Sequence, residues 1–252
     1  MPVRRFVAFI ALLFAASCGG SSDAATEVNV FAAASLADSF AELEAAYEEQ
    51  MPGIDVRLNI AGSSALREQI LAGAPADVFV SANLAVMEQV VAAGAADEPE
   101  DFVLNSIVIG VPAGNPAGVL GVEDFANPDL LLGTCAAGVP CGDAALQLFE
   151  DESIDPQLDT AEPNVGALVT KLIEGELDAG IVYVSDTVAS EQLDAVMVPP
   201  LAGVRPTITY SITALNEAPN PHGAGAFIDF AFSERAAMIF KINGFESPAR
   251  AQ

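Results

Sequence analysis

The chain has 252 residues, and its 35 acidic against 9 basic residues give a net charge of −26 at pH 7. Since nucleic acids are bound through clustered Lys and Arg, this charge excludes a nucleic-acid partner. A structural zinc site usually needs four ligands, and the only histidine, His222, is far in sequence from Cys135 and Cys141, which argues against such a site. The length beyond the first residues suffices for two lobes or one large core.

The start of the chain predicts export. Arg4 and Arg5 precede an apolar run over 6–16 that is too short to cross a bilayer as a helix. Small residues then stand before Cys18, as in a lipobox, where cleavage leaves the cysteine as a lipid-carrying N-terminus. Plain secretion with cleavage near Ala24 is the alternative, and the arginine pair is compatible with general or twin-arginine export. We expect a signal peptide over 1–17, a flexible tether over 18–26, and a protein that is extracytoplasmic, either lipid-anchored at the outer face of the cell membrane or periplasmic.

Strands and helices then alternate, which predicts α/β architecture with largely parallel sheets. Strands over 28–31, 56–60 and 77–80 each lead into a helical apolar pattern. Ser35 and Asp38 have the spacing of a capping box for the first of these helices. The second helix has two candidate caps, Ser63 and Ser64.

A second series of elements follows the strand over 106–111 and a break rich in proline and glycine. It comprises 130–132, 144–149, 166–173 and 179–184. The chain returns through an alternating strand over 207–214 to helices over 223–232 and 234–242. Because one segment leaves and later rejoins, we predict a discontinuous first lobe over 27–111 and 206–252, a second lobe over 112–205, and a hinge of two crossing strands.

Four turns of small or polar residues each precede a helical pattern. They contain Ser35, Ser63, Cys141 and Val165. A helix that begins at such a turn directs unpaired N–H groups and the positive end of its dipole at whatever lies before it. One such turn is ordinary capping, but four in one chain predict an oxyanion receptor.

Three tyrosines occur in the chain. Tyr183 ends an apolar strand, and ligands gather at the C-terminal ends of strands in open α/β sheets. Tyr47 and Tyr210 lack such a placement, so we expect them to be packing residues. His222, after Asn220-Pro221, is expected at the surface start of a helix.

Two cysteines are left once Cys18 is assigned to lipid. Cys135 and Cys141 are close enough in sequence to close a small disulfide loop in an oxidising compartment, with free thiols as the alternative. Such a loop would make the neighbouring turn rigid and preorganise its N–H donors.

Several motifs, in order, resemble the periplasmic molybdate-binding proteins of molybdate ABC importers. They lie at 32–36, 73–82, 180–183 and 240–245, and the similarity extends over nearly everything from Val28 to Phe245. The resemblance implies a type II periplasmic binding protein: two lobes, each a mostly parallel sheet flanked by helices, that close over a ligand.

The resemblance also implies a set of ligand-binding groups. In the family, two serines of one lobe face backbone amides and one tyrosine of the other, and these positions correspond here to Ser35, Ser63, Cys141, Val165 and Tyr183. Cys141 departs from the family pattern, in which an alanine is expected, but a backbone donor survives that change. The implied ligand is molybdate or tungstate and the implied partner an ABC permease. The further expectations are a monomer without a cofactor and a membrane anchor through Cys18.

The donor set fits such an anion. Molybdate is a dianion whose oxygens only accept hydrogen bonds, whereas hydrogen phosphate would favour an additional acceptor carboxylate. Sulfate requires the same donors and differs in size, so it stays an alternative ligand. Ferric iron would favour paired tyrosines or carboxylates.

Two other functions can be weighed against transport. A secreted serine hydrolase would need a nucleophile motif, but the serines at 62–65 lack the Gly-x-Ser-x-Gly pattern and His222 has no activating motif. We therefore predict that the protein is not an enzyme. An accessory adhesion lipoprotein that keeps the fold would bind no ligand.

Overall fold

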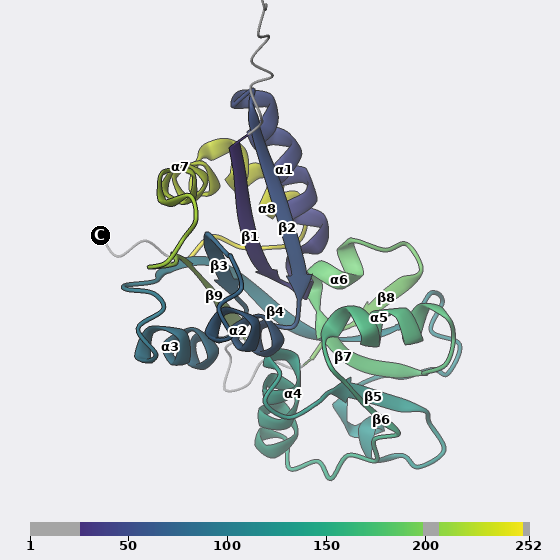
Figure 1. The fold of residues 1–252 in the computed structure, drawn as a ribbon. Helices are drawn as coiled ribbons and strands as arrows, with labels where there is room; N and C mark the ends of the chain where they lie inside the picture. Colours follow the sequence, from purple (N-terminus) through teal and green to yellow (C-terminus); the bar gives the residue numbers. More distant parts are fainter. Residues whose placement is uncertain (1–25, 199–206, 249–252) are drawn as a thin grey trace, which may run out of the picture.

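The computed structural model describes residues 26–198 and 207–248, which form two α/β lobes (Figure 1). The first lobe contains β1 (Thr26–Ala33), η1 (Ala34–Leu36), α1 (Ala37–Gln50), β2 (Ile54–Ala61), α2 (Ser63–Leu71), β3 (Val78–Ser81), α3 (Leu84–Ala92), β9 (Thr207–Ala214), α7 (Pro221–Ala231) and α8 (Glu234–Ile242). The second contains η2 (Val122–Ala126), β5 (Leu132–Cys135), α4 (Pro140–Asp151), β6 (Thr160–Glu162), α5 (Val165–Ile173), β7 (Ala179–Tyr183), α6 (Val184–Val188) and β8 (Leu193–Val196). Strand β4 (Glu100–Pro112) passes through both lobes.

In the described residues the strands form one nine-stranded sheet in the order β2-β1-β3-β9-β4-β7-β5-β6, with β8 beside β4. Parallel pairs lie at the outer parts, where β1 pairs with β2 and β3, and β5 pairs with β6 and β7. The central strands β9 and β4 run antiparallel to their neighbours. The predicted α/β class is confirmed.

Helices cover both faces of the first lobe's sheet because successive side chains of a strand point to opposite faces. Val28 and Val30 point toward α1, α7 and α8, together with Val78 of the neighbouring strand. Phe31 and Phe79 point the other way and pack with α2 and α3. The ends of these strands, where the loops begin, therefore lie between two layers of packed helices.

The link between the lobes lies in β4. Its first half pairs with β9 as far as Ser106, and from Ile107 onward it pairs with β7 and β8. Ile107 and Val111 accordingly belong to the second lobe's core. The chain changes lobe in the middle of a continuous apolar strand, earlier than the predicted boundary after Val111, because hydrophobic patterning does not reveal a change of partner. The other predicted boundary, at 205/206, lies outside the described residues.

The predicted capping box of the first helix is wrong. A short 3-10 turn, η1, comes first, and α1 begins at Ala37 with no side-chain cap. Helix α2 begins at Ser63 after Gly62, again without a side-chain cap, so neither Ser63 nor Ser64 caps it. The serine hydroxyls at these helix starts are therefore free to make other contacts.

Within 26–198 and 207–248, no helix has the length and apolarity that a bilayer span requires. The predicted signal peptide, the tether before Thr26 and Cys18 lie outside the described residues. His222 is exposed in the first turn of α7, as predicted.

Candidate functional site

A small cavity lies between the lobes, with an empty volume of about 210 Å³. All five residues predicted to bind the ligand line it. The full lining is Ala33, Ala34, Ser35, Gly62, Ser63, Ala82, Val139, Pro140, Cys141, Asn164, Val165 and Tyr183. The space inside it that a guest could fill is about 10 Å³. Pockets for organic ligands usually measure about 300–1,000 Å³, so this cavity could take only a small guest such as an ion.

The two lobes approach closely at this cavity. A methyl group added at Gly62 would lie 2.9 Å from the carbonyl oxygen of Pro163, which belongs to the other lobe. Ser64 also donates a hydrogen bond to the Gly138 carbonyl oxygen across the same gap, at 2.5 Å. The structure therefore represents the closed arrangement of the lobes.

Ser63 stands at the first position of α2, with 1% of its surface exposed. Its hydroxyl oxygen accepts a hydrogen bond from the Ala82 backbone N–H at 3.1 Å. An accepting hydroxyl keeps its own hydrogen for another partner. Ser63 can therefore donate into the cavity, which Ser63 lines and Ser64 does not.

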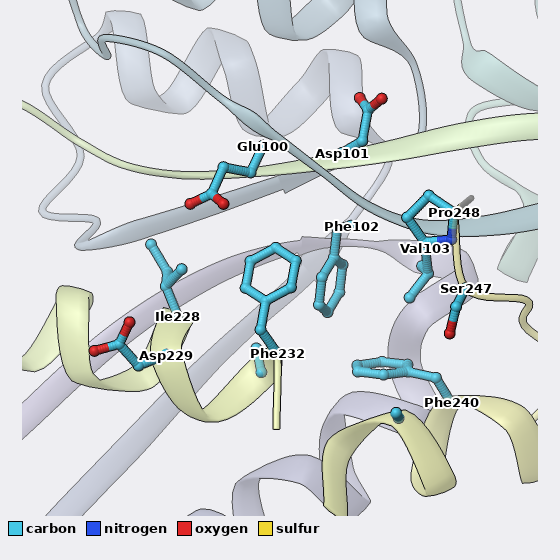
Figure 2. A pocket seen from close by; sticks show the side chains of 12 residues that line it. Glu100, Asp101, Phe102, Val103, Ile228, Asp229, Phe232, Phe240, Ser247 and Pro248 are labelled. Atoms are coloured by element: carbon cyan, nitrogen blue, oxygen red, sulfur yellow. The ribbon is translucent and has the colours of Figure 1, made fainter. Parts of the chain in front are cut away.

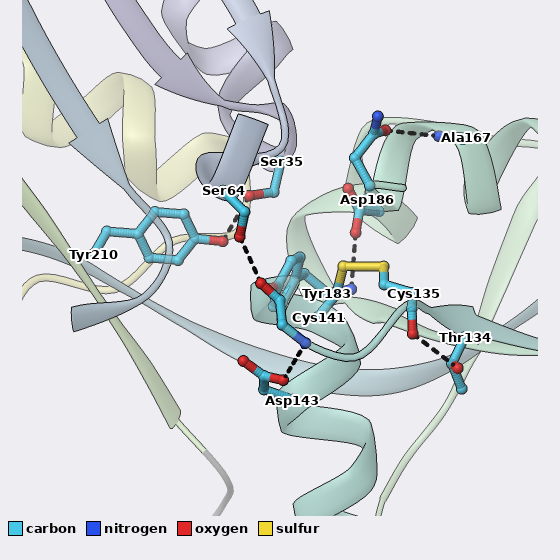
Figure 3. Close-up of a disulfide and its surroundings, with 12 residues drawn as sticks. Ser35, Ser64, Thr134, Cys135, Cys141, Asp143, Ala167, Tyr183, Asp186 and Tyr210 are labelled. Atoms are coloured by element: carbon cyan, nitrogen blue, oxygen red, sulfur yellow. Dashed lines mark hydrogen bonds between the residues drawn. A yellow bond between two sulfur atoms is a disulfide. The ribbon is translucent and has the colours of Figure 1, made fainter. Parts of the chain in front are cut away.

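Ser35 lies in η1, and its hydroxyl oxygen is 2.7 Å from that of Tyr210 on β9 (Figure 3). Tyr210 is completely buried, and its ring contacts the ring of Phe245. The expectation that Tyr210 only packs is thus incomplete, because it also binds a lining residue. Tyr47, by contrast, packs in the first lobe's core against Phe227, as expected.

Tyr183 ends β7 with 1% of its surface exposed. Its hydroxyl is buried and has no hydrogen-bond partner among the described residues. Burial raises the pKa of this hydroxyl well above its usual value, and Tyr210 and the carboxylates of Asp186 and Asp143 raise it further. Tyr183 therefore stays protonated and presents an unused donor.

The second lobe also presents backbone donors. Cys141 is the second residue of α4 and Val165 the first of α5, and N–H groups at these positions have no partner within their helix. Asn164 caps α5 by accepting from the Ala167 N–H at 3.0 Å. Glycine is required at 142, since a methyl group there would lie 2.1 Å from the Ala136 carbonyl oxygen. The start of α4 is consequently pressed against the end of β5.

A disulfide joins Cys135 to Cys141, with 5.5 Å between their Cα atoms (Figure 3). It closes the loop that leads from β5 into α4. In this loop Gly138 adopts a φ of +80° and its N–H donates to the Asp143 carboxylate at 2.7 Å. The Asp143 carboxylate is thus hydrogen-bonded within the loop. The same loop supplies the Gly138 carbonyl oxygen, which accepts a hydrogen bond from Ser64.

The described side chains that line the cavity carry no charge. Of the described residues around it, none is acidic, basic or histidine. Asp186 is hydrogen-bonded to a lining residue, since its carboxylate accepts the Tyr183 N–H at 2.8 Å. Burial raises the pKa of Asp186 to about 7, opposed by that N–H and assisted by Asp38. Positive potential in the cavity thus comes from dipoles and not from a buried cation.

A larger hollow on the first lobe has the opposite character (Figure 2). Its empty volume is about 1130 Å³, and its lining includes the acidic residues Glu100, Asp101 and Asp229 as well as Phe102 and Phe240. Three carboxylates would repel an anion. The cavity between the lobes is therefore the candidate site for an oxyanion.

Two α/β lobes that are linked through a shared strand and enclose a cavity of hydrogen-bond donors define a two-lobed solute-binding protein. The chain belongs to the bacterial extracellular solute-binding protein family, whose model matches residues 28–246. The protein is accordingly an extracytoplasmic binding protein and not an enzyme, and the family resemblance drawn from the sequence motifs is confirmed.

Particular relatives narrow the comparison. The molybdate-binding protein ModA of Mycobacterium tuberculosis is 35% identical over 236 residues, which cover 93% of this chain and 90% of the relative. ModA of Escherichia coli is 34% identical, with 93% and 94% covered. The structure of the periplasmic molybdate-binding protein of Azotobacter vinelandii superposes with a TM-score of 0.75 at 17% identity, covering 88% of this chain and 100% of that one, and shows the shared fold.

Proposed function

We propose that this protein captures molybdate, and tungstate equally, in the cavity between its lobes and delivers the ion to the permease of an ABC importer. One observation carries the proposal: Tyr183 lines the cavity, and its hydroxyl is buried and has no hydrogen-bond partner among the described residues. A buried unsatisfied donor costs roughly 1–3 kcal/mol. A ligand oxygen that accepts from Tyr183 removes this cost.

The chemistry of the lining favours a fully deprotonated anion. The Ser35, Ser63 and Tyr183 hydroxyls and the N–H groups of Cys141 and Val165 all offer donors. The described lining residues include no carboxylate that could accept a hydrogen bond from a protonated ligand. Molybdate and tungstate accept at every oxygen and have the same size and charge. The two relatives at 34% and 35% identity bear the name molybdate-binding protein, which supports the same choice.

The distribution of donors over the lobes supplies the mechanism of capture. Ser35 and Ser63 come from the first lobe, whereas Tyr183 and the two backbone amides come from the second. An ion held by the first lobe gains the remaining hydrogen bonds only when the lobes meet. Because the closed state binds the ion more strongly, the ion shifts the equilibrium between open and closed protein toward the closed state.

Calorimetric titration of the purified protein with molybdate, tungstate, sulfate and phosphate tests this function. We expect molybdate and tungstate to bind with similar affinity, sulfate more weakly because it is smaller, and phosphate more weakly because it carries a proton. Absence of heat with molybdate, or a preference for phosphate, would overturn the proposal.

Delivery and anchoring need tests in cells. We propose that Cys18 carries the lipid that holds the protein near its permease, and a Cys18→Ala variant should be released from the membrane fraction and fail to incorporate labelled fatty acid. Removal of the protein should abolish molybdate uptake at low external concentration. The intact chain should restore uptake, whereas Tyr183→Phe should restore it only at higher molybdate.

A further inference from the structure

We infer that Asn105 and Tyr210 form a relay of hydrogen-bond donors that turns the Ser35 hydroxyl hydrogen toward the bound anion, which makes Tyr210 a positioning residue for the ligand. This inference rests on the proposed function, because it concerns how the same cavity presents its donors. Neither Asn105 nor Tyr210 lines the cavity, and both act through Ser35.

The orientation of the Asn105 amide is the first step. Its side-chain oxygen accepts the Ser106 backbone N–H at 2.9 Å, so the oxygen is fixed on that side. The amide nitrogen then faces the opposite way, where it lies 2.9 Å from the Ser185 hydroxyl oxygen and 3.4 Å from that of Tyr210. A side-chain amide nitrogen only donates, so Tyr210 accepts from Asn105.

The direction of the Ser35–Tyr210 bond follows from that acceptance. In the described part of the chain, the hydroxyl of Tyr210 is hydrogen-bonded to Asn105 and Ser35. With Asn105 donating, the only acceptor left for the tyrosine hydrogen is the Ser35 oxygen, 2.7 Å away. Ser35 then accepts from Tyr210 and keeps its own hydrogen for the cavity. The reverse direction would aim serine lone pairs at an anion.

Ser63 shows the same arrangement with a simpler donor. Its oxygen accepts the Ala82 N–H, which leaves its hydrogen for the cavity in the same way. In both cavity serines of the first lobe, the hydroxyl oxygen thus accepts a hydrogen bond from another group of the protein. For Ser63 that donor is the Ala82 backbone N–H. For Ser35 the donor is the Tyr210 side chain, supported by Asn105, and a substitution can remove it.

Burial preserves the relay. Tyr210 is 0% exposed and Asn105 2% exposed, so bulk water does not compete for their hydrogen bonds. The two residues lie on β9 and β4, the antiparallel pair that links the lobes. Asn105 also donates to Ser185 of the second lobe, so the relay is in place where the two lobes meet.

Tyr210→Phe is the primary test, with affinity for molybdate measured by calorimetry and unfolding of the ligand-free protein measured in parallel. The ring packing is kept and only the hydroxyl is lost. We expect affinity to fall roughly five- to tenfold, the effect of one hydrogen bond. Tyr47→Phe is the matched control, since Tyr47 is a buried tyrosine of the same lobe remote from the cavity, and its affinity should not change.

A double-variant cycle separates positioning from general damage. In a Ser35→Ala background, Tyr210→Phe should cause no further loss of affinity, because its effect passes through the serine hydroxyl. Equal losses in both backgrounds would overturn the inference, as would full affinity of Tyr210→Phe in the native background. If the intact protein does not bind molybdate at all, the proposed function itself fails.

Asn105→Asp provides an independent test should Tyr210→Phe fold poorly. An aspartate oxygen in place of the amide nitrogen accepts from Tyr210 and draws its hydrogen away from Ser35. We expect a larger loss of affinity than for Tyr210→Phe, again abolished in the Ser35→Ala background. Unchanged affinity in a folded Asn105→Asp protein would contradict the relay.

Discussion

The rings of Tyr183 and Tyr210 meet edge to face, with centroids 6.3 Å apart and planes at 65°, although they come from different lobes. Their hydroxyls differ in one respect. That of Tyr210 is hydrogen-bonded to Ser35, whereas that of Tyr183 has no partner among the described residues. The Tyr210 hydroxyl is therefore satisfied within the first lobe, whereas the Tyr183 hydroxyl remains available to a bound ligand.

Tyr183→Phe should separate binding from stability. Without ligand, removal of an unpaired buried hydroxyl should leave the free energy of unfolding unchanged or raise it. With molybdate, the variant loses a donor to a buried anion, and affinity should fall by roughly 1–3 kcal/mol. Chemical denaturation of the free protein and calorimetric titration measure the two effects. A variant that is destabilised yet binds normally would assign Tyr183 to the core alone.

Ser64→Ala should weaken binding although Ser64 is not among the described residues that line the cavity. Its bond to the Gly138 carbonyl joins the two lobes and can form only when they are closed. We expect a loss of roughly 0.5–1.5 kcal/mol in affinity, together with a more open ligand-free protein by small-angle scattering. Ser247→Ala, at an exposed serine of the first lobe, is the control. Identical affinities of the two variants would argue against a closing role.

Replacement of both Cys135 and Cys141 by serine should lower stability and affinity together. The short loop that the disulfide closes accounts for roughly 2–3 kcal/mol in the chain-entropy model. The same loop carries the Cys141 N–H and the Gly138 carbonyl, so a looser loop should also weaken binding. Thermal unfolding with and without molybdate measures both. Reductant should reproduce the effect in the native protein and have none in the double variant.

Asp186 should make stability depend on pH. Burial raises the pKa of its carboxyl to about 7 in the folded protein, above the unfolded value near 3.8. Between these values the folded state holds more protons, so this group makes the free energy of unfolding fall as pH rises toward 7 and level off above it. Asp186→Asn keeps an oxygen for the Tyr183 N–H and should flatten this part of the profile. Denaturant unfolding at intervals from about pH 4 to about pH 8 is the measurement, and parallel profiles for the two proteins would contradict the assignment.

Local pattern in the sequence indicates four turns before helices and one strand end, whereas the choice of the five lining residues as ligand-binding residues comes from the family resemblance. Those positions are visible in the local pattern, as at Val165 after Asn164 or Tyr183 at the end of β7. The alternation in 207–214 likewise predicts the bounds of β9. Local pattern therefore predicts these element positions, although it fails for the side-chain caps of α1 and α2.

Features that depend on a distant partner could not be predicted. Tyr210 lies 175 residues from Ser35, and nothing near either residue indicates the hydrogen bond that replaces the expected capping box. Strand β4 changes from one core to the other without a change in its apolar character. The three-residue strand β6 has too few residues for a period to show.

Anomalous diffraction at the molybdenum edge, from crystals of the protein grown with molybdate, tests the central claim most directly. The account predicts a single strong peak in the cavity between the lobes, surrounded by the hydroxyls of Ser35, Ser63 and Tyr183 and the amides of Cys141 and Val165. A peak elsewhere, contact with one lobe only, or a bound cation beside the ion would contradict it.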